Sequence, residues 1–140
     1  MARILSASET VFPLAETFTI SRGSRTEART VTVEVRDGAR AGHGESVPYA
    51  RYDETVDGVI AEIMALQEAI AAGLDRAALQ QALPGGAARN ALDCALWDLE
   101  ARQSGRRAYE IAGLASPGPV ETAFTLSLEA PDLMREKAQK

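Results

Sequence analysis

The chain has 140 residues, a formal net charge of −5 and 46% hydrophobic residues, which is typical of a globular domain. No run of 18 apolar residues occurs, so a membrane-spanning helix is excluded. The acidic balance without a basic stripe argues against nucleic-acid binding. A single cysteine, Cys94, excludes a disulfide framework. Because no signal segment is recognisable at the N-terminus, we expect a cytoplasmic protein.

The first 46 residues predict an antiparallel meander of three or four strands. Residues 4–14 and 17–20 are rich in β-branched residues and would form the first two strands. Residues 28–36 show the clearest alternation of apolar and polar positions. Asp37-Gly38 is a typical two-residue hairpin turn, and residues 39–46 would return as the partner strand. The polar sequence SRGSRTE, residues 21–27, is predicted to be a loop.

Apolar residues take helical spacing after Tyr52. One helix is predicted from about Val56 to Gly73, with Asp53 or Thr55 as its cap. The remaining sequence predicts a helix over residues 76–83 capped by Asp75, a long helix over residues 87–104 that ends at Gly105, and one more turn over residues 108–111.

The sequence LASPGP then reads as a linker, and strand character returns over residues 120–128. A further helix opens at Pro131. A strand followed by a helix is half of a βαβ unit, and a lone parallel strand cannot satisfy its backbone groups. We therefore expect the chain to belong to a larger fold.

Three stretches carry a resemblance to a known family. They are FPLAETFTISRGSRTEARTVTVEV (12–35), GHGE followed by PYARYDET (42–45 and 48–55), and GAARNALDCALWDLEAR (86–102). Together with the order of the predicted elements, these stretches resemble the enolase superfamily. Within it the chain is most similar to the dipeptide epimerases of the L-Ala-D/L-Glu epimerase type.

The resemblance implies an α+β fold and a division of the chain into three parts. Residues 1–112 would form the N-terminal capping domain, an antiparallel β-meander plus three helices. Residues 113–119 would be a linker. Residues 120–140 would be the first strand and part of the first helix of a (β/α)7β barrel, which is too long to fit in 140 residues.

In this family the barrel supplies two lysines and three carboxylate ligands for Mg²⁺, which stabilises an enediolate during 1,1-proton transfer at the α-carbon. Lys137 and Lys140 are the only lysines here, and no Lys-x-Lys pair is present. We therefore expect no catalytic residue and no metal ligand in this chain. It would be inactive alone and part of an isomerase when joined to its own C-terminal barrel domain, which would bind the Mg²⁺.

Four residues are candidates for substrate binding. The resemblance implies that Arg25, in the RGSR loop, binds a substrate carboxylate, to which a guanidinium pairs bidentately. Otherwise Arg25 is a solvated loop arginine. Arg22 is a weaker candidate for substrate binding, and its alternative role is to order the loop. Thr125 would face the barrel interior near the substrate, or simply reflect β propensity. Ile20 would line the pocket or belong to the core.

Two other reactive side chains have plainer interpretations. His43, the only histidine, lies between two glycines where the backbone bends or approaches another segment closely. Without a second ligand it is expected to pack or hydrogen-bond rather than to bind metal. Cys94 is expected to be a buried thiol.

Two classes of function therefore remain open. The first is an enzyme acting on a dipeptide with an acidic residue, with a muconate cycloisomerase-like enzyme or an N-acylamino-acid racemase as the alternatives within that class. The second is a non-catalytic module that binds a small acid or a partner, if 140 residues is the native length. Assembly with further copies of the chain is compatible with both.

Overall fold

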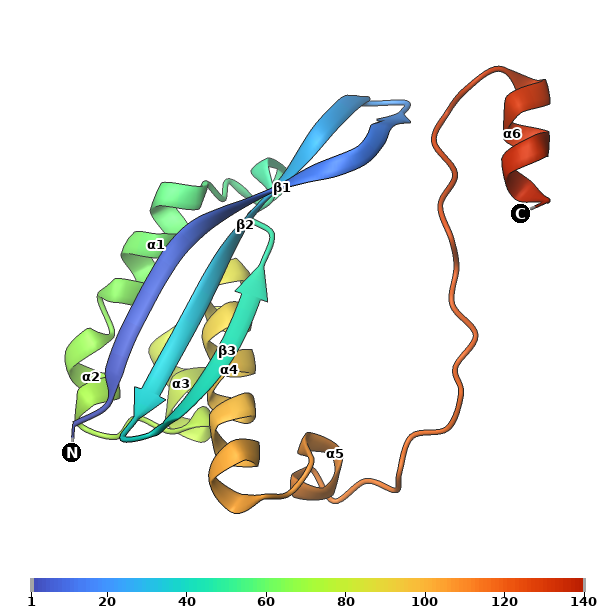
Figure 1. Cartoon of the computed structure of the whole chain (residues 1–140). Coiled ribbons are helices and arrows are strands. Elements are labelled where there is room, and N and C mark those ends of the chain that lie inside the picture. Colours follow the sequence, from blue (N-terminus) through green and yellow to red (C-terminus); the bar gives the residue numbers. More distant parts are fainter. Residues whose placement is uncertain (1, 140) are drawn as a thin grey trace. The chain divides into compact units, whose positions relative to one another are not determined.

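The computed structural model describes residues 2–139, and its sheet confirms the antiparallel meander. Strands β1 (Ile4–Ile20), β2 (Gly23–Asp37) and β3 (Arg40–Ser46) lie in the order β1-β2-β3 (Figure 1). β2 and β3 pair antiparallel, from Val31 opposite Ser46 to Asp37 opposite Arg40. Val31, Val33 and Val35 are buried, so the alternation in the sequence marks the inner face of the sheet.

The predicted loop over residues 21–27 and the separate strand over 17–20 are wrong. Only Ser21 and Arg22 form a turn, and both strands of the hairpin continue up to it. The hydroxyl groups of Thr19 and Ser24 lie 2.8 Å apart across the hairpin. Residues 21–26 are exposed on both faces of the hairpin. They therefore lack the alternation of apolar and polar side chains by which a strand with one buried face is recognised in a sequence.

Within residues 2–139, seven helical segments follow the sheet. They are the 3₁₀ turn η1 (Ala50–Tyr52) and helices α1 (Val56–Met64), α2 (Gln67–Ala71), α3 (Arg76–Ala82), α4 (Ala87–Ser104), α5 (Ala108–Ile111) and α6 (Pro131–Ala138).

The predicted long helix from Val56 is divided in two. Helix α1 ends at Met64 and α2 begins at Gln67. The predicted caps are present, since Thr55 accepts a hydrogen bond from the Gly58 amide and Asp75 accepts one from the Ala78 amide.

Strand β3 lies directly against helix α4, which Figure 1 shows beside it. A Cβ atom on Gly42 would overlap the carbonyl of Ala95, and one on Gly44 would overlap the carbonyl of Ala91. The close approach predicted around His43 is therefore confirmed, and only glycine fits at these two positions. Among the described residues, the core contains 15 buried apolar side chains from the sheet and helices α1 to α4, including Ile63, Leu79, Leu92 and Leu99.

The chain forms two compact units. We call residues 2–10 and 29–117 the sheet-and-helix unit, and residues 11–28 and 118–139 the hairpin-tip unit. All of the buried apolar core belongs to the sheet-and-helix unit. The hairpin-tip unit combines the turn end of the β1–β2 hairpin with the extended C-terminal segment.

The strand predicted over residues 120–128 is not formed. This segment is extended but has no regular strand pairing within residues 2–139. Its backbone makes a hydrogen bond from the Leu128 amide to the Thr19 carbonyl, at 2.8 Å. Val120 and Phe124 are 82% and 88% exposed. A strand requires a ladder of neighbouring backbone partners, and this ladder is missing from the described part of the chain.

Candidate functional site

A cavity of about 730 Å³ lies in the hairpin-tip unit. Its walls come from both parts of this unit, the two strands of the hairpin and the C-terminal segment. Its lining includes Leu14, Phe18, Arg25, Phe124, Thr125 and Lys137. An apolar cavity with a few polar groups is typical of sites for small organic ligands.

The structure brings two of the four predicted site residues together in this cavity. Arg25 on β2 and Thr125 on the extended segment both line it, although 100 positions separate them in the sequence. Both residues are exposed, and Arg25 has no hydrogen-bond or ion-pair partner within residues 2–139. Its guanidinium is therefore free to pair with a carboxylate from a ligand.

The other two candidates lie beside the hairpin turn. Ile20 is the last residue of β1 and is half-buried, and Arg22 is exposed in the turn itself. Neither is among the residues that line the cavity. The arrangement favours Arg25 and Thr125 over Ile20 and Arg22 as ligand contacts.

Sequence reasoning missed the place of Lys137 in this cavity, since it considered this residue only as one of the two lysines of the chain. The side chain is only 21% exposed, and its Nζ lies 2.7 Å from Glu16 Oε2 and 2.9 Å from Glu129 Oε2. The hydrogen bond to Glu16, followed by that to Glu129, raises the pKa of Lys137 above its ordinary value. The two glutamates lie far apart in the sequence, so no local pattern could have indicated this cluster.

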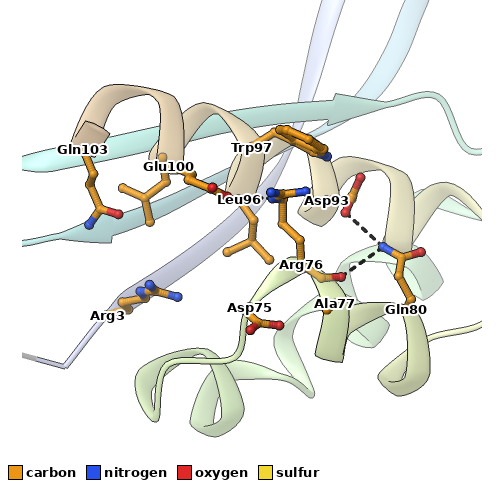
Figure 2. A pocket seen from close by; sticks show the side chains of 11 residues that line it. Arg3, Asp75, Arg76, Ala77, Gln80, Asp93, Leu96, Trp97, Glu100 and Gln103 are labelled. Atoms are coloured by element: carbon orange, nitrogen blue, oxygen red, sulfur yellow. Dashed lines mark hydrogen bonds and ion pairs between the residues drawn. The ribbon is translucent and has the colours of Figure 1, made fainter. Parts of the chain in front are cut away.

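A second cavity, of about 740 Å³, lies in the sheet-and-helix unit between α3 and α4. Figure 2 shows Arg76 below the ring of Trp97, at 3.4 Å from the ring centroid. Arg76 also pairs with Glu100 at 2.8 Å, and Gln80 donates a hydrogen bond to Asp93 at 3.0 Å (Figure 2). Because Arg76 is already paired with Glu100, whereas Arg25 has no partner within residues 2–139, the first cavity is the better candidate site.

The imidazole of His43 lies between two carboxylates. Its Nε2 is 3.1 Å from Glu34 Oε2, and its Nδ1 is 3.6 Å from Asp98 Oδ2. No group of three or more His, Cys, Asp or Glu side chains within residues 2–139 is arranged to hold a metal ion. The contact between His43 and Glu34 is the kind of hydrogen bond that the sequence predicted.

The expectation of a buried Cys94 is wrong, since this side chain is exposed. Its neighbours Ala95 and Leu96 are buried. Cys94 therefore lies outside the buried face of α4. Partial burial, followed by the charge of Asp93, raises the pKa of the Cys94 thiol, so the thiol is not activated as a nucleophile.

No helix within residues 2–139 is long and apolar enough to cross a membrane.

A three-stranded meander followed by a helical layer packed on β3 is the fold of the N-terminal capping domains of the enolase superfamily. Residues 5–113 match the family described as "Mandelate racemase / muconate lactonizing enzyme, N-terminal domain". The chain belongs to this family, as its sequence motifs predicted.

Two curated relatives are similar to this chain. The L-Ala-D/L-Glu epimerase of Escherichia coli (strain K12) is 45% identical over 136 residues, which is 97% of this chain and 42% of the relative. The N-acetyl-D-glutamate racemase of a Pseudoalteromonas species is 43% identical over 108 residues, which is 76% of this chain and 34% of the relative. This chain thus spans less than half the length of either enzyme.

Solved structures of other proteins are also similar to this chain over nearly its whole length. One is the structure of an enolase family member from Agrobacterium tumefaciens with homology to dipeptide epimerases, which has sodium and L-Ala-L-Glu bound. It matches this chain with a TM-score of 0.90 and 52% sequence identity, and the match covers 96% of this chain and 41% of that one. Another is the structure of a dipeptide epimerase from Enterococcus faecalis in complex with Mg and L-Leu-L-Tyr. It matches with a TM-score of 0.83 and 27% sequence identity, and the match covers 99% of this chain and 42% of that one.

Proposed function

We propose that this chain is the N-terminal, substrate-capping part of a Mg²⁺-dependent epimerase that acts on dipeptides with an acidic residue. The observation that carries this proposal is the single cavity lined by both Arg25 and Thr125. The similarity to an L-Ala-D/L-Glu epimerase over 97% of the chain supports the reaction class.

In this proposal the hairpin tip selects the distal end of the substrate. The Arg25 guanidinium holds the side-chain or terminal carboxylate, because it keeps its charge and pairs bidentately with two oxygens. The apolar cavity walls, including Phe18 and Phe124, would contact the apolar parts of the bound dipeptide.

In this proposal, the groups that transfer the proton and hold the Mg²⁺ come from the barrel domain of the complete enzyme. Lys137 is held between two glutamates, and the proposal gives it no part in proton transfer. In the complete enzyme, Mg²⁺ would supply stabilisation of the enediolate. The contribution of the present residues is then binding and orientation, which raise the rate by holding the α-carbon in place.

Racemisation of an N-acylated acidic amino acid is a second candidate, since the Pseudoalteromonas relative is an N-acetyl-D-glutamate racemase. Both substrates present a carboxylate to Arg25, so the cavity alone does not separate them. The reaction class is the same, and only the group on the substrate nitrogen differs.

The test is α-proton exchange into D₂O, followed by NMR. The product of the complete reading frame is expected to exchange the α-proton of L-Ala-L-Glu in the presence of Mg²⁺, and faster than that of N-acetylglutamate. Residues 1–140 alone are expected to show no exchange. A reading frame that stops at Lys140, or exchange catalysed by residues 1–140 alone, would contradict this proposal, and the former would favour a binding module.

Arg25→Ala tests the assigned contact in the same assay. We expect it to lower kcat/KM for L-Ala-L-Glu by about 100-fold, which corresponds to the loss of one charge-assisted pair of about 3 kcal/mol. Arg22→Ala is the matched control, because Arg22 is exposed and lies outside the cavity lining. Equal effects of the two substitutions would remove Arg25 from the site.

A further inference from the structure

Strand β1 is an edge strand, since the sheet order is β1-β2-β3. The backbone groups on its outer side have no neighbouring strand within residues 2–139, and such groups require other partners. Near the hairpin turn these groups are the carbonyl of Thr17 and both backbone groups of Thr19, and all of them are hydrogen-bonded to the C-terminal segment.

Ser127 provides the first anchor. It is one of the few buried polar residues, at 5% exposure. Its Oγ accepts a hydrogen bond from the Thr19 amide at 2.9 Å and donates one to the Thr17 carbonyl at 3.3 Å. The next residue, Leu128, donates its amide to the Thr19 carbonyl at 2.8 Å. One hydroxyl group thus satisfies two backbone groups of the edge strand, a task that alanine cannot perform.

Lys137 provides the second anchor, from helix α6. Its ammonium group joins Glu16 on β1 to Glu129, which precedes that helix. Glu16 is 121 positions away from Lys137 in the sequence, so the contact ties the hairpin to the C-terminal segment. Both Lys137 and Ser127 line the cavity that also holds Arg25 and Thr125.

We propose that Ser127 and Lys137 are positioning residues that dock the hairpin tip onto the C-terminal segment and so fix Arg25 relative to Thr125. This inference rests on the proposed function. The cavity walls come from two stretches of chain 90 residues or more apart in the sequence, and these two anchors are side-chain links between them. Because Arg25 is exposed on a two-stranded ribbon, its place in the site depends on where the ribbon is held.

Lys137 is suited to this structural task rather than to proton transfer. A lysine that acts as a base at neutral pH needs a lowered pKa, whereas the two glutamates raise the pKa of Lys137. Its ammonium group therefore stays charged and keeps both ion pairs throughout the neutral range.

The first experiment is NMR-detected amide hydrogen exchange on the 140-residue chain. Ser127→Ala removes the acceptor of the Thr19 amide, so we expect exchange at Thr19 to rise at least about tenfold, with no change at Val33 in the sheet. Ser127→Thr keeps the hydroxyl and is expected to restore slow exchange.

Lys137→Met keeps the aliphatic stem and removes the charge, and we expect it to speed exchange at Thr19 as well. Arg135→Met is the matched control on the same helix, because Arg135 pairs only with the exposed Asp132 among the described residues. Exchange at Thr19 that is the same in Ser127→Ala, Lys137→Met and Arg135→Met would overturn the docking role.

The second experiment measures epimerisation by the product of the complete reading frame. Lys137→Met is expected to raise KM for L-Ala-L-Glu about fivefold with kcat within about twofold, and Lys137→Arg to restore KM. If Lys137 acts by placing Arg25, adding Lys137→Met to Arg25→Ala should raise KM no further.

Two results separate the possible failures. Independent, multiplicative effects of Arg25→Ala and Lys137→Met would overturn the positioning role while the proposed function stands. Absence of epimerisation by the wild-type protein would overturn the proposed function, and the exchange rate at Thr19 would still decide whether the two anchors dock the hairpin.

Discussion

Two carboxylates of the sheet-and-helix unit, Glu34 and Asp98, are held in their charged form. The side-chain hydrogen bond from Arg36 is the largest cause that lowers the pKa of Glu34. Burial acts in the opposite direction at Asp98, but hydrogen bonds from the His43 amide at 2.9 Å and from Arg102 at 2.9 Å outweigh it and lower the pKa of Asp98. Both groups therefore bind protons less readily in the folded than in the unfolded chain.

This difference predicts acid sensitivity. A carboxylate whose pKa is lower in the folded than in the unfolded chain stabilises the fold at pH values above its unfolded-state pKa, which is near 3.8 for Asp98. This stabilisation is lost as the pH falls through the folded-state pKa. Asp98→Asn should cost about 1 kcal/mol of unfolding free energy at pH 7 and much less at pH 3. Urea denaturation at the two pH values measures this.

Asp132→Asn is the control, since Asp132 is 92% exposed. This substitution should leave the unfolding free energy unchanged at both pH values. A loss in Asp98→Asn that is equally large at pH 3 would show that the carboxylate charge is not the cause.

At the scale of elements, the close contact between β3 and α4 determines how the helical layer packs on the sheet. Gly44→Ala would place a methyl group on the Ala91 carbonyl and 2.7 Å from the Ala95 amide. Because both obstacles are backbone, neither can move aside as a side chain would. We expect a loss of about 2–3 kcal/mol in unfolding free energy, measured by urea denaturation. Gly118→Ala, where no atom lies within 4 Å, should be neutral.

The elements that were predicted correctly are those with a local signal. Helix α4 and the pairing of β2 with β3 follow from apolar periodicity and from the Asp37-Gly38 turn. The continuous hairpin around Ser21 and the break between α1 and α2 were missed, because exposed ribbons and helix junctions leave no such pattern. Arg25 and Thr125 were predicted as substrate contacts from the resemblance, and both line one cavity. Lys137, which lines the same cavity, was not singled out, since its partners are distant in the sequence.

At the scale of the whole chain, the two units differ in what stabilises them. All of the buried apolar core lies in residues 2–10 and 29–117, whereas in the hairpin-tip unit the described links are polar and Phe124 and Val120 remain exposed. Burial of apolar surface is the main source of folding free energy. The sheet-and-helix unit should therefore fold without the C-terminal segment, and the hairpin tip should not keep its docked position.

A chain that ends at Pro117 tests this directly. We expect its urea unfolding free energy to lie within about 1 kcal/mol of that of residues 1–140, because no residue of the buried apolar core is removed. Leu92→Ala, a core truncation, should cost about 2–5 kcal/mol in both chains. Amide exchange should become fast at Thr19, which loses Ser127, and stay slow at Val33. Loss of cooperative unfolding in the shorter chain would show instead that the core depends on residues 118–139.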